Sequence, residues 1–281
     1  MIPPSFDYVA PDSLDGALQA LADGGEDARP LAGGHSLLPL MKLRLAAPPL
    51  LVDLRRVPGL DGVERADGGW RIGALTRHAA LQRRRELGVV AEAASLIADQ
   101  QVRNRGTIGG SLAHGDPASD LPAVALALDG VIVARGPGGT REIAAADFFQ
   151  DYLTTALAPG ELVTEVRLPA LDGWGFGYEK FARRAEDWAM VGVCALVRRA
   201  PDGSCADARV ALVNMGGTPL RARAVEEALR GSALDGDAIA QAAEQAADGT
   251  DPPGDLNASP DYKRHLARVL TRRALRRAAE A

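Results

Sequence analysis

The sequence predicts an α+β protein of three units, and three observations lead to that prediction. The chain has 281 residues, which is more than one typical domain of about 100–150 residues. Strand and helix signals are interleaved up to about residue 170, whereas the rest of the chain carries strand signals first and helix signals afterwards. We therefore expect units at residues 1–56, 57–170 and 171–281, the last an antiparallel sheet with helices.

The first unit has the pattern of a small α/β arrangement. A helix is expected from Pro11-Asp12-Ser13 to Gly24-Gly25, because leucine and alanine recur there at helical spacing. A short strand is expected over residues 29–32, a brief helix over 37–43 and a buried strand over 50–54.

The second unit begins with an expected strand over residues 70–74. Thr76 is the expected N-cap of helical segments over 78–87 and 89–98. The stretch 100–120 is polar and contains glycine, and such a long connection is typical of a functional loop. Further strands are expected over 131–134 and 162–168, with a short helix over 145–152 between them.

The third unit contains the expected antiparallel strands 176–181, 190–198 and 208–213, with a hairpin turn at Pro201–Ser204. Helices are expected over 220–230, 235–248 and 261–279, and a loop over 250–260. In the last helix Leu266, Val269, Leu270 and Leu275 form one apolar face opposite an arginine-rich one. This pattern favours a docking helix with a solvated face over a membrane-surface helix.

Composition excludes several classes of protein. The net charge is −5, so the chain lacks the excess of basic residues that is typical of nucleic-acid-binding proteins. The two cysteines, Cys194 and Cys205, cannot supply a zinc or iron–sulfur site, so any such centre must belong to a partner, and Cys194 is expected to be inert core. The N-terminus has no signal-peptide pattern, and no apolar stretch approaches the roughly 18 residues of a transmembrane helix. We expect a soluble cytoplasmic protein.

Two glycine-rich segments carry the candidate chemistry. In Leu31–Pro39 a strand runs into Gly33-Gly34 and then into a helix start, which suits a pyrophosphate because backbone N–H groups can approach an anion closely there. A tight turn is the alternative explanation of this segment alone. Neither G-x-G-x-x-G nor G-x-x-x-x-G-K-[ST] occurs in the chain, which disfavours Rossmann and P-loop folds.

The second segment, Asn104–Ser111, places another glycine pair between the hydroxyls of Thr107 and Ser111. Nine residues later Asp120 offers a carboxylate that can accept hydrogen bonds from sugar or ribitol hydroxyls. Two such segments in separate units suggest a diphosphate held between two lobes.

Ala32-Gly33-Gly34-His35-Ser36 and Thr107-Ile108-Gly109-Gly110-Ser111, together with residues 178–188, resemble the medium, FAD-binding subunit of molybdenum hydroxylases. This family includes carbon monoxide, nicotine and caffeine dehydrogenases and the flavin domain of xanthine dehydrogenase, and the carbon monoxide branch is the most similar. The resemblance covers essentially the whole chain. It implies two lobes of the vanillyl-alcohol-oxidase (PCMH) type, as in the cell-wall enolpyruvyl reductases, followed by a C-terminal α+β domain.

The resemblance also implies roles for particular residues. The two motifs would hold the FAD pyrophosphate, and Asp120 would bind a hydroxyl of the cofactor. Val163 or Leu162 would contact the cofactor through the main chain, and Lys180 would lie near the flavin ring. A lysine there would stabilise the anionic reduced flavin. We expect no catalytic residue and no metal ligand in this chain.

The resemblance implies an electron-transfer subunit with two partners: a large subunit with the molybdenum cofactor and a small subunit with two [2Fe–2S] clusters, assembled as a dimer of heterotrimers. Electrons would pass to quinone, NAD or oxygen, with carbon monoxide as the first-choice substrate of the complex. Nicotine-, caffeine-, aldehyde- or xanthine-type hydroxylases remain alternatives. So do a stand-alone FAD oxidoreductase and a regulatory scaffold. If the protein contacts a membrane, we expect the contact to be peripheral, on the inner face of that membrane, and to be made through the complex.

Five further residues have competing interpretations. For His35 a role in loop shape or hydrogen bonding is favoured over catalysis, and His78 is expected to be structural or on the surface. His114 and Asp116 are not expected to bind metal. For Trp188, core packing and lining of the flavin pocket remain equally open.

Overall fold

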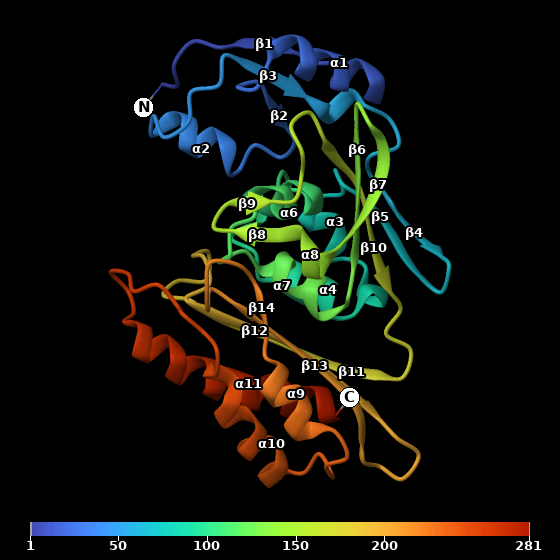
Figure 1. Ribbon diagram of the computed structural model, residues 1–281, viewed down its shortest axis with the longest axis vertical. Helices are drawn as coiled ribbons and strands as arrows, with labels where there is room; N and C mark the ends of the chain where they lie inside the picture. The colour runs from blue at the N-terminus through green and yellow to red at the C-terminus, as the bar shows by residue number, and fades with distance from the viewer. Residues whose placement is uncertain (1, 281) are drawn as a thin grey trace.

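The first unit of the computed structural model, which describes residues 2–280, is a parallel three-stranded sheet at one end of an elongated molecule (Figure 1). Its strands have the order β1-β3-β2. The Ser13 hydroxyl caps α1 by accepting from the Gly16 amide at 3.2 Å. These elements are β1 (Asp7–Val9), α1 (Leu14–Gly24), β2 (Arg29–Leu31), α2 (Leu37–Lys42) and β3 (Leu50–Asp53).

The second unit is built on a five-stranded antiparallel sheet of order β4-β5-β10-β6-β7. The last strand in sequence, β10, lies in its centre, where Val166 is opposite Ile72 on one side and Ile132 on the other. The prediction missed both edge strands because they are largely exposed and lack apolar alternation. The strands are β4 (Val63–Ala66), β5 (Gly69–Gly73), β6 (Val131–Gly136), β7 (Gly139–Ala144) and β10 (Leu162–Pro169).

Short helices cover this sheet on the side that faces the third unit (Figure 1). They are α3 (His78–Leu81), α4 (Val89–Ser95), α5 (Gln100–Arg103), α6 (Ile108–His114), α7 (Asp120–Ala127) and α8 (Ala145–Phe148), with a small hairpin of β8 (Phe149–Asp151) and β9 (Thr154–Thr155) and a 3-10 turn at Arg85–Leu87. Another 3-10 turn, Leu54–Arg56, follows β3 in the first unit.

Four predictions for this region were wrong, and one helix was missed. The stretch 100–120 is not a loop, because it contains α5 and α6 and ends at the start of α7. Helix α7 escaped prediction because every one of its residues is buried, which leaves no apolar periodicity. Thr76 is not a cap, because its hydroxyl donates to the Gly62 carbonyl and accepts from the Gly62 amide, both at 2.9 Å. The helices expected over 78–87 and 145–152 are each a single turn, followed by a 3-10 turn and a strand respectively.

The third unit is the expected antiparallel sheet with helices, so the predicted α+β class is confirmed. Strand β12 is apolar and buried from Val191 to Val197 because both faces of its sheet are covered there. Cys194 and Leu196 pack toward the second unit, whereas Val193, Ala195 and Val197 pack toward the C-terminal helices. The elements are β11 (Trp174–Phe181), β12 (Val191–Arg199), β13 (Cys205–Val213), β14 (Leu220–Arg221), α9 (Arg223–Leu229), α10 (Gly236–Ala243) and α11 (Pro260–Glu280), with a 3-10 turn at Glu244–Ala247.

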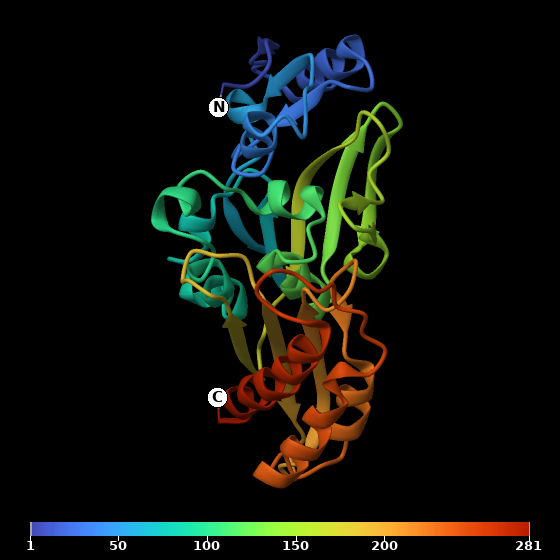
Figure 2. The same ribbon diagram turned by 90° about the vertical axis from the view of Figure 1, so that its left-hand side faces the viewer.

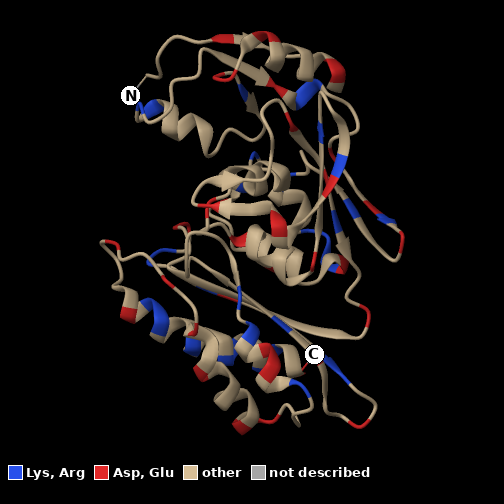
Figure 3. Cartoon of the chain, viewed as in Figure 1, with Lys and Arg blue, Asp and Glu red and all other residues tan. Residues whose placement is uncertain are grey.

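Helix α11 lies across the outer face of this sheet (Figure 2) and carries basic residues along its length (Figure 3). Leu266, Leu270 and Leu275 are buried as expected, but Val269 is only half-buried. From Ile2 to Glu280, no helix combines the length and the apolar character that crossing a bilayer requires.

Two arginines fix the third unit to the second. Arg277 on α11 pairs with Glu92 of α4 and donates to the Tyr178 carbonyl at 2.9 Å. Arg221 on β14 donates to the Asp129 carboxylate at 2.7 Å, just beyond α7. Because the sheet of the third unit is thereby held against α4 and α7, its side chains can take fixed positions in a site shared with the second unit.

Candidate functional site

A cavity of about 630 Å³ opens where the three units meet. This volume lies within the range of small-molecule and cofactor sites. Both glycine segments line it, and the third unit contributes Lys180 and Trp188. The cavity therefore gathers residues from all three units, which are far apart in the sequence.

The first glycine segment offers a run of unused backbone donors. Among the hydrogen bonds of the described chain, none is donated by the amides of Gly33, Gly34, His35 or Ser36. Gly34 has φ +79°, a left-handed conformation that favours glycine. Successive backbone amides in such a turn form a concave site suited to an anion.

The two glycine segments lie directly against each other. A Cβ atom on Gly33 would come within 2.4 Å of the Arg105 carbonyl oxygen and 2.7 Å of the Gly106 Cα atom. A Cβ atom on Gly110 would lie 3.6 Å from the Ala32 Cβ atom. Gly33 is therefore required for contact between the two units, in addition to any approach to a ligand.

The second segment forms the first turn of α6. The Thr107 hydroxyl caps this helix by accepting from the Gly110 amide at 3.2 Å. The Ile108 and Gly109 amides donate to the Thr76 and Ala74 carbonyls at 3.0 and 2.8 Å. These two amides anchor α6 to the end of β5, and the Ser111 amide donates to the Thr107 carbonyl at 3.0 Å. A ligand would therefore meet the Thr107 and Ser111 side chains and the bare Cα face of Gly110.

Asp120 and Lys180 form a buried ion pair in the wall of the cavity. The Lys180 Nζ atom donates to Asp120 Oδ2 at 2.9 Å and to the Leu96 carbonyl at 3.0 Å. The Tyr178 hydroxyl donates to Asp120 Oδ1 at 2.6 Å. Burial raises the pKa of Asp120, while the Lys180 cation and the Tyr178 hydrogen bond oppose that shift.

Of the residues predicted to bind a cofactor, all but one line the cavity. Ile108 does not, because its side chain is buried in the core of the second unit. The residues that line the cavity are Ala32, Gly33, Gly34, His35, Ser36, Thr107, Gly109, Gly110, Ser111, Asp120, Val163 and Lys180, and Leu162 lies beside Val163 in the same wall.

Trp188 lines the cavity and does not belong to the core, since 54% of it is exposed. Its neighbours Glu186 and Asp187 also line the cavity, as do Ile97 and Val102, and none of these four was predicted. Their segments carry no glycine motif, so only the folded arrangement reveals them. Cys194 is buried as expected, and burial raises the pKa of its thiol well above its usual range.

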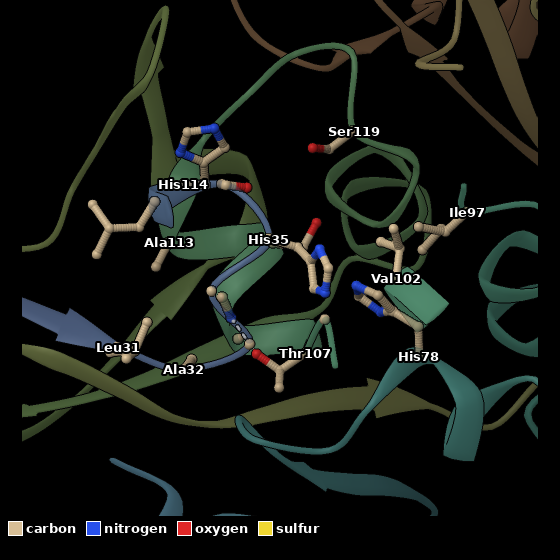
Figure 4. Close-up of a pocket in the computed structure, with 18 of the residues that line it drawn as sticks. Leu31, Ala32, His35, His78, Ile97, Val102, Thr107, Ala113, His114 and Ser119 are labelled. Carbon is tan, nitrogen blue, oxygen red and sulfur yellow. Dashed lines mark hydrogen bonds between the residues drawn. The ribbon is translucent and has the colours of Figure 1, made fainter. Parts of the chain in front are cut away.

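The imidazoles of His35 and His78 face each other at one side of the cavity (Figure 4). His78 is buried, and its Nδ1 atom has no hydrogen-bond partner among the residues described. Burial, with smaller contributions from Arg103 and His35, lowers the pKa of His78 to about 4. His114 also lines the cavity, whereas the Asp116 carboxylate accepts from the Ala118 amide at 2.8 Å in a local turn.

His78 should make the fold sensitive to acid. The unfolded imidazole takes up a proton below pH about 6.5, but the buried one stays neutral down to about pH 4. The unfolded state therefore binds more protons in this window, and stability should fall by about 2 kcal/mol between pH 7 and pH 5 on account of this residue. Urea unfolding at both pH values should show that His78→Gln loses this component and that His265→Gln, at an exposed position, keeps it. An equal pH dependence in all three proteins would contradict the assignment.

Comparison with known proteins agrees with this geometry. Residues 4–171 match the family described as FAD binding domain in molybdopterin dehydrogenase, and residues 176–278 match the CO dehydrogenase flavoprotein C-terminal domain. The chain is 43% identical to the carbon monoxide dehydrogenase medium chain of Hydrogenophaga pseudoflava, over 98% of this chain and 97% of that one. It is also 43% identical to subunit alpha of the 6-hydroxypseudooxynicotine dehydrogenase complex of Paenarthrobacter nicotinovorans, over 99% and 96%.

The fold is also similar to that of a relative whose structure has been solved. A structure of carbon monoxide dehydrogenase from Hydrogenophaga pseudoflava superposes with a TM-score of 0.95 at 44% identity, covering 99% of this chain and 98% of the other. The family matches, the relatives and the superposition each extend over nearly the whole chain. The chain therefore belongs to the FAD-binding medium subunits of the molybdopterin-dependent dehydrogenases, with a C-terminal domain of the CO dehydrogenase flavoprotein type.

Proposed function

We propose that this chain holds FAD in the cavity between its units and transfers electrons within a three-component molybdenum hydroxylase. The observation that carries the proposal is the meeting of the two glycine segments at one cavity that also contains a buried lysine. We further propose that residues 1–56 and 57–170 act as the two lobes that hold the cofactor and that residues 171–281 complete the site.

The residues present fit FAD. A diphosphate needs several donors at short range, and the free amides of Gly33–Ser36 supply them where no Cβ atom intervenes. Asp120 retains free lone pairs for a ribityl hydroxyl, because a carboxylate has about four acceptor sites and two are used. We assign FAD contacts to Ala32, Gly33, Gly34, His35, Ser36, Thr107, Gly109, Gly110, Ser111, Asp120, Val163 and Lys180. Ile108, which was predicted with them, instead supports the site by anchoring α6 through its amide, which donates to the Thr76 carbonyl.

Bound FAD would supply the junction between one-electron and two-electron transfer. The chain itself contributes position and charge. Lys180, which is paired with Asp120, places a cation in the cavity wall, where it would stabilise negative charge on a reduced cofactor. Trp188 lines part of the cavity from the third unit.

We propose that the electrons come from another chain. Both cysteines are buried in the third unit, and between residues 2 and 280 no three His, Cys, Asp or Glu side chains are grouped to hold a metal. We therefore propose a small subunit with [2Fe–2S] clusters as donor, a large subunit with the molybdenum cofactor as the site of substrate oxidation, and a dimer of such heterotrimers. Quinone, NAD or oxygen would be the final acceptor.

Carbon monoxide is our first choice of substrate for the complex, and a hydroxylase of the nicotine type is the second. Equal identity to a carbon monoxide dehydrogenase medium chain and to a 6-hydroxypseudooxynicotine dehydrogenase subunit supports both. Such equality is expected if the substrate is bound on the large subunit, because the medium subunit then experiences no selection for it.

The proposal is tested with the purified full chain and with its complex. The chain should bind FAD with one equivalent at saturation, and its flavin absorption should bleach with substrate only when the iron–sulfur and molybdenum subunits are present. Carbon monoxide, nicotine and an aldehyde are supplied separately to identify the substrate. Turnover of an organic substrate by the isolated FAD-loaded chain would instead establish a stand-alone oxidoreductase, and absence of flavin binding would leave a scaffold.

A further inference from the structure

Tyr178 lies behind the cavity wall and contacts Asp120 directly. Its hydroxyl is 2.6 Å from Asp120 Oδ1, while the Lys180 Nζ atom is 2.9 Å from Asp120 Oδ2. Each carboxylate oxygen thus has its own donor. Tyr178 is only 1% exposed and, unlike Asp120 and Lys180, does not line the cavity.

One strand delivers both donors. Tyr178 and Lys180 are two residues apart on β11, so their side chains leave the same face of the sheet. That face meets the first residue of α7, which is Asp120. The contact joins the second and third units at the point where both reach the cavity.

Tyr178 can only donate in this contact. Burial, together with the neighbouring Asp120 carboxylate, raises the pKa of Tyr178 well above its usual range, so the phenol keeps its proton. The other titratable groups nearby are the Cys194 thiol on β12, which is also neutral, and Glu92 on α4, which pairs with Arg277. Among the residues that the structure describes, the Tyr178 hydroxyl has no other hydrogen-bond acceptor, so its proton is directed at Asp120.

We propose that Tyr178 is a positioning residue of the flavin site: its hydroxyl keeps the Asp120 carboxylate ionised and turned toward Lys180, and so sets the charge of the cavity wall. This role rests on the proposed binding of FAD in the same cavity. Without the hydroxyl, Asp120 would take up a proton at higher pH, lose its ion pair with Lys180 and become a poorer acceptor for a cofactor hydroxyl.

The pH dependence of FAD affinity tests this role in the full chain. Wild-type affinity should fall on the acid side as Asp120 protonates, and Asp120→Asn should remove that acid limb. Tyr178→Phe should move the limb to higher pH by about one to two units, because one hydrogen bond to a charged group is lost. Above the limb, Tyr178→Phe and wild type should agree within about twofold.

Tyr8→Phe is the matched control, because the Tyr8 hydroxyl also donates to an aspartate, Asp53, at 2.6 Å but neither residue lines the cavity. Its acid limb should coincide with that of wild type. An unmoved limb in Tyr178→Phe, or an equal loss of affinity at every pH, would overturn the role of Tyr178. Infrared titration of the Asp120 carboxyl in the flavin-free chain measures the shift caused by Tyr178→Phe without using FAD. The role of Tyr178 can therefore be tested even if wild type does not bind FAD, a result that would refute the proposed function alone.

Discussion

Replacing Gly33 by valine is expected to lower the affinity of the full chain for FAD by about 100-fold or more, since at least two charge-assisted hydrogen bonds would be lost. The added Cβ atom would overlap the Arg105 carbonyl oxygen and the Gly106 Cα atom, and backbone cannot move aside as a flexible side chain can. The first glycine segment would then separate from the second, and its free amides would no longer face the same cavity. Fluorescence titration of the purified variant with FAD measures the loss.

Gly236→Ala is the control for this experiment, because a Cβ atom there meets nothing within 4 Å. Gly110→Val should give a smaller effect than Gly33→Val, since its Cβ atom would first meet the Thr107 hydroxyl at 2.8 Å rather than backbone. Full flavin occupancy in both valine variants would refute the assignment of the glycine segments to FAD.

Lys180→Met is expected to destabilise the chain by about 3–5 kcal/mol and to weaken FAD binding, because it leaves Asp120 buried without its cation. The pKa of Asp120 should rise further in this variant, since Lys180 would no longer oppose the effect of burial. Urea unfolding gives the loss of stability and FAD titration the loss of affinity. The double variant Asp120→Asn/Lys180→Met should regain part of the stability without regaining affinity.

A variant of Lys263 separates the effect of Lys180→Met on stability from its effect on FAD binding. It is also a buried lysine, with its Nζ atom 2.8 Å from Asp255 Oδ2, but it lies on α11 away from the cavity. Lys263→Met should therefore lose stability while FAD affinity stays near the wild-type value. If Lys180→Met behaved in the same way, Lys180 would be a structural residue only.

The sequence predicted those features that depend on local patterns. Strands β5, β10 and β12 have the apolar residues expected of buried strands, and the two glycine segments stand out by composition. Edge strands and α7 were missed for opposite reasons, since the former are too exposed and the latter too buried to show periodicity.

The rest of the site depends on contacts between distant segments. Nothing in the sequence around Tyr178 indicates that its hydroxyl meets Asp120, because that contact exists only once β11 is packed against α7. Ile108 lies within a glycine motif and was assigned with it, yet its side chain points into the core. Trp188 could be placed in the cavity only from the folded chain, since its exposure distinguishes lining from packing.

The central position of β10 has a consequence for how the protein is made on the ribosome. This strand separates β5 from β6, although it is the last of the five to be synthesised. The sheet of the second unit therefore cannot close until Pro169 has left the exit tunnel, and the chain before it must wait with unpaired strand edges. The cavity also needs Lys180 and Trp188, which follow β10 in the chain, so we expect flavin to be bound only after the third unit has begun to emerge.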